Sequence, residues 1–165
     1  MKKRLLAFLL LFSAICSWGA GYDISKLTNN DGLSNSSINV VYQTSEGLMW
    51  FGTWDGLDVY DGKDFKVFKP ELDNASSISN NIIRDVIEQR PGIVWIATDL
   101  GINRFDTGRK RFDRFFFDTQ KRGVTAEQSF RLMMDRDKAV FAYVLGLGFF
   151  RFDEAKGDFV QIRVD

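Results

Sequence analysis

The chain has 165 residues, of which 22 are basic and 22 acidic, and it contains one cysteine and no histidine. The absence of histidine removes the most common general base, the most common zinc ligand and every Ser-His or Cys-His nucleophile pair. The balanced charge, with no basic block, argues against nucleic acid contact by this segment. We therefore expect no catalytic residue, no metal site and no cofactor.

The first 19 residues have the pattern of a signal peptide. Residues 2–4 are basic, residues 5–15 are apolar, and the small residues that follow fit cleavage after Gly19. The apolar run is short for a stable membrane span, although an uncleaved anchor is the alternative. Cleavage removes Cys16 and leaves 19 basic and 22 acidic residues. A chain exported without disulfides suits the bacterial periplasm.

A repeat of about 45 residues occupies most of the remaining chain. The segment EGLMWFGTWDGLDVYD at 46–61 returns as PGIVWIATDLGINRFD at 91–106 and, eroded, as VFAYVLGLGFFRFD at 140–153. Repeats of this length are typical of α-solenoids and of β-propellers. Helical periodicity is absent outside the leader, which disfavours the solenoid.

Each repeat unit is predicted to contain four short β-strands. In the first unit we expect them at 38–43, 48–53, 57–60 and 65–69, with a tight turn at Asp61-Gly62 before the last one. Four strands in this length make a propeller blade. The predicted fold is therefore all-β, with three four-stranded antiparallel blades at 37–81, 82–127 and 128–165.

Six repeated positions have expected structural roles: Trp50, Gly52, Gly56, Trp95, Gly101 and Gly148. The two tryptophans lie mid-strand, where blades would pack face to face. Gly52 would keep its side of the strand small. The other three glycines follow the second strand, where we expect a positive φ.

The two ends of the repeat region suggest an incomplete ring. Residues 20–36 are predicted to be a closing strand and a connector, with Tyr22–Leu27 filling the place of a fourth strand in a last blade. Closed propellers have roughly four to eight blades, so three do not close a ring. Either the chain is truncated, which we favour, or several copies assemble into a ring.

The segment Asp31-Gly32-Leu33-Ser34 and the later Trp50-Phe51-Gly52-Thr53 with Asp55-Gly56-Leu57 resemble the two-component regulator propeller repeat. The resemblance implies a seven-bladed propeller at the N-terminus of a hybrid two-component sensor histidine kinase from Bacteroidota-like bacteria. It implies a periplasmic, non-catalytic sensor of oligosaccharides or other small ligands, in a receptor anchored in the inner membrane. Its partners would be the remaining blades of the same receptor and, in a homodimer, a second copy of that receptor.

Two other functions stay open from the sequence. One is a freestanding exported propeller that binds glycans or acts as a scaffold and closes by oligomerisation. The other is a fragment of an extracellular propeller lyase or hydrolase, which the missing histidine weakens.

Three residues form the predicted ligand contact. Trp54 and Asp55 lie in the loop between the second and third strands, and Asp99 takes the place of Trp54 in the next unit. An exposed aromatic ring there could stack on a sugar, while Asp55 accepts a hydroxyl hydrogen bond. The alternative is that Trp54 covers a neighbouring blade.

Overall fold

The computed structural model describes residues 24–117 and 129–163, and these form three four-stranded antiparallel sheets. A short 3-10 helix, η1 (Asn29–Asp31), precedes them. Blade 1 contains β1 (Ile38–Gln43), β2 (Met49–Thr53), β3 (Leu57–Tyr60) and β4 (Phe65–Phe68). Blade 2 contains β5 (Ile83–Arg90), β6 (Ile93–Thr98), β7 (Ile102–Asp106) and β8 (Arg111–Phe115). Blade 3 contains β9 (Phe130–Met134), β10 (Val140–Val144), β11 (Gly148–Asp153) and β12 (Asp158–Gln161).

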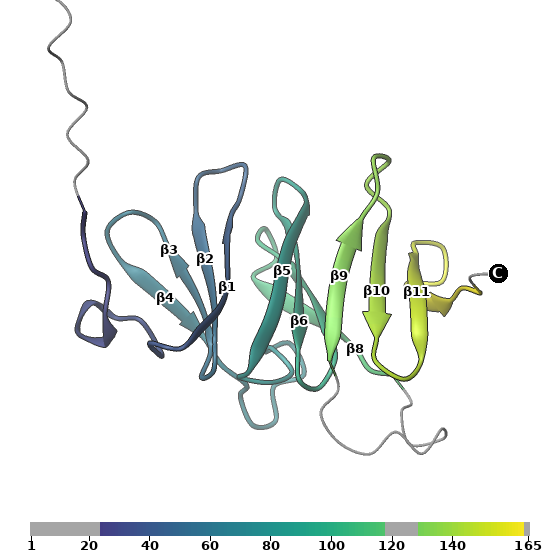
Figure 1. Ribbon diagram of the computed structural model, residues 1–165, viewed down its shortest axis with the longest axis horizontal. Coiled ribbons are helices and arrows are strands. Elements are labelled where there is room, and N and C mark those ends of the chain that lie inside the picture. The colour runs from purple at the N-terminus through teal and green to yellow at the C-terminus, as the bar shows by residue number, and fades with distance from the viewer. Residues whose placement is uncertain (1–23, 118–128, 164–165) are drawn as a thin grey trace, which may run out of the picture.

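The strands of each sheet follow one another in chain order, and each pairs with the next through a hairpin. The sheets stand side by side in chain order (Figure 1). The first strand of blade 2, β5, contacts the first strands of both other blades, β1 and β9. The arrangement confirms the predicted all-β fold of antiparallel blades.

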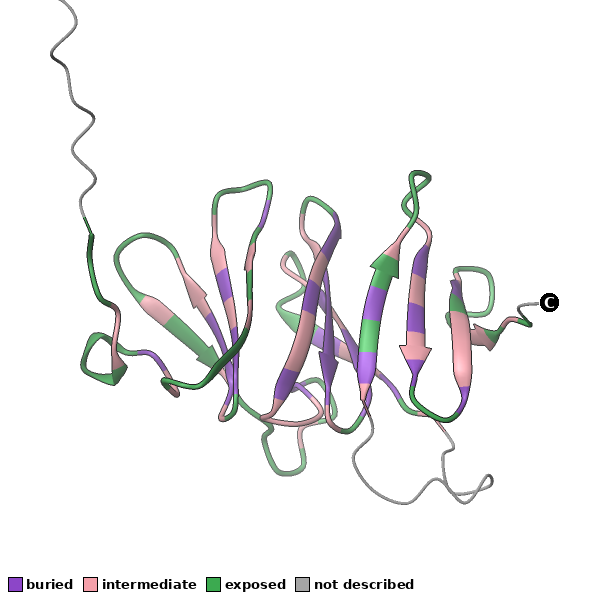
Figure 2. Cartoon of the chain, viewed as in Figure 1, coloured by how far each residue is buried: buried purple, intermediate pink, exposed green. Residues whose placement is uncertain are grey.

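Two hydrophobic cores lie between the blades. The first joins blade 1 to blade 2 and includes Trp50, Val86 and Phe105, while the second joins blade 2 to blade 3 and includes Trp95, Phe130 and Phe152. The central sheet is therefore buried on both faces, as Figure 2 shows for β5 and β6. Burial of apolar surface between blades, at about 25 cal/mol per Å², is the main force that holds them together.

The two repeated tryptophans occupy equivalent places in these cores. Trp50 is 1% exposed, and its ring lies 5.9 Å from that of Phe105 in an edge-to-face arrangement. Trp95 is fully buried, with its ring centroid 4.7 Å from that of Phe152 in blade 3. Each indole therefore fills the interface with the following blade.

Polar contacts also bridge the blades. The carboxylate of Glu88 accepts hydrogen bonds from the backbone N–H and hydroxyl of Ser45, at 2.7 and 2.9 Å. Asp85 accepts one from the backbone N–H of Leu132 at 3.0 Å. These bonds fix how far one blade can slide on the next, because buried polar groups that lose their partners are costly.

Two repeated glycines are required by close approach. A Cβ on Gly52 would lie 2.5 Å from Val40 Cγ1 and 2.6 Å from Ile83 Cγ2, at the interface with blade 2. The positive φ predicted at three positions is present at Gly56 (145°) and Gly148 (94°), but the prediction was wrong for Gly101. There a Cβ would instead lie 2.4 Å from the carbonyl oxygen of Phe115.

The predicted leader lies outside the described residues, and so does the start of the predicted closing strand. The described part of that strand, residues 24–27, has no regular secondary structure. Within 24–117 and 129–163 no helix is long and apolar enough to cross a membrane.

Candidate functional site

The predicted ligand residues lie on one edge of the blades, which we call the connector face. It consists of the β2–β3, β6–β7 and β10–β11 loops, together with the connectors that enter β1 and β5, and it forms the lower edge of Figure 1. Backbone hydrogen bonds fasten each loop to the segment that enters the first strand of its own blade. The N–H of Trp54 donates to Ser37, that of Asp99 to Ile82, and that of Leu145 to Ser129. The three loops are therefore held in equivalent positions.

An arginine of blade 2 joins two of the three predicted residues. The Arg84 guanidinium carbon lies 5.2 Å from the ring centroid of Trp54, within the range of a cation–π interaction. The same guanidinium forms a two-bond ion pair with Asp99, in which Nη2 donates to Oδ2 at 2.9 Å. Trp54 remains 49% exposed, so the ring both contacts the next blade and presents surface to solvent.

Asp55 faces a different set of partners. Its carboxylate accepts hydrogen bonds from Lys69 at 2.7 Å and from the Asn81 amide at 3.1 Å. These two bonds hold the pKa of Asp55 below its ordinary value. Asp55 is thus an ionised acceptor beside Trp54, and it also ties blade 1 to the connector that leads into blade 2.

Arg84 was not among the residues predicted from the sequence to lie at the site. This residue follows Asn39 by one repeat length and precedes Arg131, which occupies the same place near the start of β9. The equivalent residues of blades 1 and 3 also bridge blades. Asn39 donates a hydrogen bond to the carbonyl of Ile83 at 2.8 Å, and Arg131 donates one to the carbonyl of Arg84 at 3.3 Å. A polar residue repeated inside an apolar strand was the available signal.

The side chains of this cluster have the groups that a ligand contact needs. A half-exposed indole ring offers a flat apolar surface, and the guanidinium and carboxylates beside it offer hydrogen-bond donors and acceptors. Among the described residues no group of three or more His, Cys, Asp or Glu side chains could hold a metal ion.

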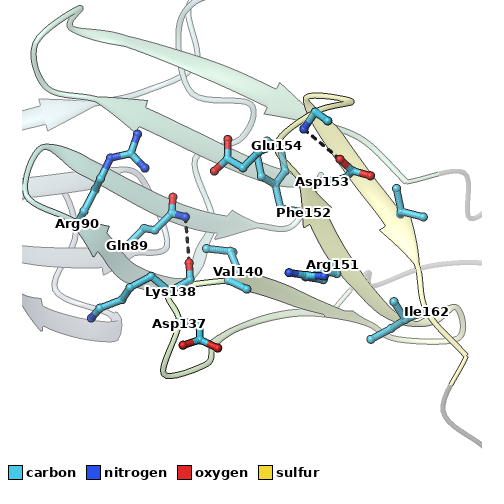
Figure 3. Close-up of a pocket in the computed structure, with 13 residues that line it drawn as sticks. Gln89, Arg90, Asp137, Lys138, Val140, Arg151, Phe152, Asp153, Glu154 and Ile162 are labelled. Atoms are coloured by element: carbon cyan, nitrogen blue, oxygen red, sulfur yellow. Dashed lines mark hydrogen bonds between the residues drawn. The ribbon is translucent and has the colours of Figure 1, made fainter.

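A hollow of about 690 Å³ lies elsewhere, at the hairpin ends of blades 2 and 3 (Figure 3). Its lining includes the buried side chains of Val140 and Phe152 and the charged side chains of Arg90, Lys138 and Glu154. None of the three predicted ligand residues lines it. The hollow and the Trp54 cluster are separate features.

Three consecutive four-stranded sheets, packed face to face with their first strands in contact, are the blades of a β-propeller. Residues 32–55 match the family model described as "Two component regulator propeller". Over this segment the repeat resembles that of the two component regulator propeller family.

Solved structures share the fold. The chain is 24% identical to BT3049 of B. thetaiotaomicron, described as the extracellular domain of a hybrid two component system, with a TM-score of 0.70 over 84% of this chain and 20% of that one. A second such domain, BT4673 of the same organism, is 18% identical, with a TM-score of 0.62 over 82% of this chain and 17% of that one.

The chain is also similar in sequence to a histidine kinase. Histidine kinase P4 of Formosa agariphila is 31% identical over 70 residues, which make up 42% of this chain and 5% of the relative. The chain therefore spans only a small part of the proteins it matches.

Proposed function

We propose that the chain is a ligand-sensing propeller segment of a hybrid two-component receptor, that it acts in the periplasm, and that it responds to oligosaccharides without catalysis of its own. The matching repeat family and the similarity to a histidine kinase and to extracellular receptor domains support this role. The observation that carries the proposal is the half-exposed Trp54 ring, held against Arg84 on the connector face.

The proposed contact is a stacked sugar ring. An indole offers a rigid apolar surface to the C–H face of a sugar at little cost in conformational entropy. Asp55 and the Arg84–Asp99 pair lie beside Trp54 and can exchange hydrogen bonds with the sugar hydroxyls. The contact with Arg84 would hold the Trp54 ring in a defined position before the ligand binds, which lowers the entropic cost of binding.

Replacement of Trp54 by alanine in the full-length receptor tests this role. An aromatic contact contributes about 0.5–1.5 kcal/mol beyond its area, so half-maximal response should require up to about tenfold more ligand. The assay is a transcriptional reporter exposed to a panel of defined oligosaccharides. Leu72→Ala is the control, because Leu72 is 94% exposed and lies outside the cluster. An unchanged dose–response curve for Trp54→Ala would sink the proposal.

The outer faces of blades 1 and 3 have a proposed partner as well. Val41 and Val67 on blade 1 are 51% and 39% exposed, and Met133 on blade 3 is 40% exposed. We propose that further blades of the same receptor pack against these two faces. Light scattering on the chain after size-exclusion chromatography separates this from the freestanding alternative. A monodisperse oligomer would favour a ring assembled from several copies.

A further inference from the structure

Blade 2 contains a chain of three hydrogen bonds, and a different group donates the proton of each one. The Asn103 amide Nδ2 donates to Ser79 Oγ at 2.9 Å, Ser79 Oγ lies 3.0 Å from Thr98 Oγ1, and Thr98 Oγ1 donates to the Gly101 carbonyl at 3.0 Å. Since an amide nitrogen only donates, the Ser79 proton is free to go to Thr98. Three contacts are thus served by three protons.

Blade 1 repeats this chain with a carboxyl group in place of the amide. Asp58 Oδ2 lies 2.7 Å from Ser34 Oγ, Ser34 Oγ lies 3.0 Å from Thr53 Oγ1, and Thr53 Oγ1 donates to the Gly56 carbonyl at 2.9 Å. The two hydroxyls supply only two protons for these three contacts. A proton on the carboxyl group of Asp58 would supply the third, so that all three contacts are hydrogen bonds, as they are in blade 2.

The surroundings of Asp58 also disfavour a negative charge. The residue is fully buried, and its Oδ1 has no hydrogen-bond partner among the described residues. The charged groups that face it are Lys69, after β4, and Asp55, in the β2–β3 loop, and the Lys69 ammonium lies 2.7 Å from Asp55. Burial raises the pKa of Asp58, against the lowering effect of the Ser34 hydrogen bonds and of Lys69.

The asparagine in the second copy shows that a neutral side chain of this shape fits. Asn103 is fully buried, and its Oδ1 accepts from the backbone N–H of Ser79 at 2.9 Å, as Asp58 Oδ2 does from that of Ser34 at 3.1 Å. A protonated carboxyl group is close in shape to an amide. In Asp58 both contacts with Ser34 fall on Oδ2, so this oxygen would donate to the Ser34 hydroxyl and also accept from the Ser34 N–H.

We propose that Asp58 is a neutral, protonated carboxylic acid in the folded blade, where it takes the place of Asn103 and holds the connector that contains Ser34. This connector precedes β1 and is fastened to β3 by both bonds of Ser34 to Asp58.

The direct test is a pH titration of the side-chain carboxyl ¹³C signals of the full chain by NMR, with Asp58 identified by its absence in Asp58→Asn. We expect the Asp58 signal to keep the chemical shift of a protonated acid at pH values above 3.8, the ordinary pKa of this side chain, and the Ser34 amide signal to change when Asp58 titrates. Titration of Asp58 at or below 3.8 would overturn the proposal.

Reciprocal substitutions give an independent readout by urea unfolding. Since the folded pKa is the higher one, the wild type loses stability as the pH rises from the unfolded pKa through the folded pKa. Asp58→Asn should therefore unfold at a higher urea concentration than the wild type at neutral pH, and this gain should vanish as the pH falls towards 3.8. Asn103→Asp should show the opposite change. A lower midpoint for Asp58→Asn at neutral pH would indicate an ionised carboxylate, in contradiction to the proposal.

Discussion

The two interface tryptophans differ in one hydrogen bond, and this difference predicts unequal costs for the same substitution. Trp95 Nε1 donates to Gln89 Oε1 at 3.0 Å, whereas Trp50 Nε1 is buried with no partner among the described residues. Replacement of each by phenylalanine deletes the same atoms from sites that are almost equally buried. The cavity cost is therefore similar in the two variants, and the remaining difference comes from the N–H group.

The magnitude follows from what each substitution leaves behind. Trp95→Phe leaves Gln89 Oε1 unpaired at a residue that is only 8% exposed, while Trp50→Phe removes a donor that has no acceptor. A buried polar group without its partner costs about 1–3 kcal/mol. We therefore expect Trp95→Phe to be less stable than Trp50→Phe by about 1–3 kcal/mol.

Urea unfolding of the full chain, followed by circular dichroism, measures the difference. With a slope of about 1–3 kcal/mol per molar urea, the two midpoints should differ by about 1 M. The slope must be the same for both variants, because a changed slope would indicate a change in the unfolding reaction itself. Equal midpoints, or a lower midpoint for Trp50→Phe, would refute the reasoning.

Two further predictions concern backbone approach and acid stability. Gly101→Ala should lower the melting temperature strongly, because its Cβ would lie 2.4 Å from the Phe115 carbonyl oxygen; Gly108→Ala, whose nearest contact would be a side-chain oxygen at 3.3 Å, should change it little. Burial raises the pKa of Asp113, but the hydrogen bonds led by Arg104 outweigh it and hold the pKa below 3.8. The stability due to Asp113 is therefore present above pH 3.8 and is lost as the pH falls through the lower folded pKa. In Asp113→Asn the urea midpoint should therefore change less with pH below about pH 4 than it does in the wild type. A variant profile parallel to that of the wild type would contradict this.

Much of the fold could be predicted because local patterns determine it. The first unit forms strands at 38–43, 49–53, 57–60 and 65–68, within one residue of the expected bounds. Alternating side chains and turn residues such as Asp61-Gly62 act over a few residues, so they can be identified directly in the sequence. The repeat then extends the same assignment to the other two blades.

At Gly101 the repeat led to a wrong prediction of the backbone conformation. Its place in the repeat matches Gly56, which has a φ of 145°, so the same backbone reason was expected for both. The actual constraint is the Phe115 carbonyl, at the end of β8 and 14 residues away along the chain. A close approach between strands depends on sheet geometry, which a pattern of glycines does not specify.

The site shows a different limit. Trp54 and Asp99 could be proposed from loop position, but Arg84, which contacts both, lies on a strand of the next blade. The packing of blade 1 on blade 2 brings Trp54 and Arg84 together, and nothing in the sequence near either residue indicates the pairing. Contacts of this kind depend on the interface, so they become predictable only when the relative position of two blades is known.

Differences between copies are therefore the most informative positions of the repeat. Equivalent places in blades 1 and 2 have nearly the same backbone, so an exchanged side chain must satisfy the same contacts or be balanced elsewhere. Asp58 in the place of Asn103 can make every hydrogen bond of the chain when its carboxyl group carries a proton. Asp99 pairs with Arg84 of its own blade, whereas Trp54, at the equivalent place of blade 1, packs against Arg84 of the next blade. Arg84 interacts with both residues, which accounts for a tryptophan held at the edge of the sheet while half its surface faces solvent.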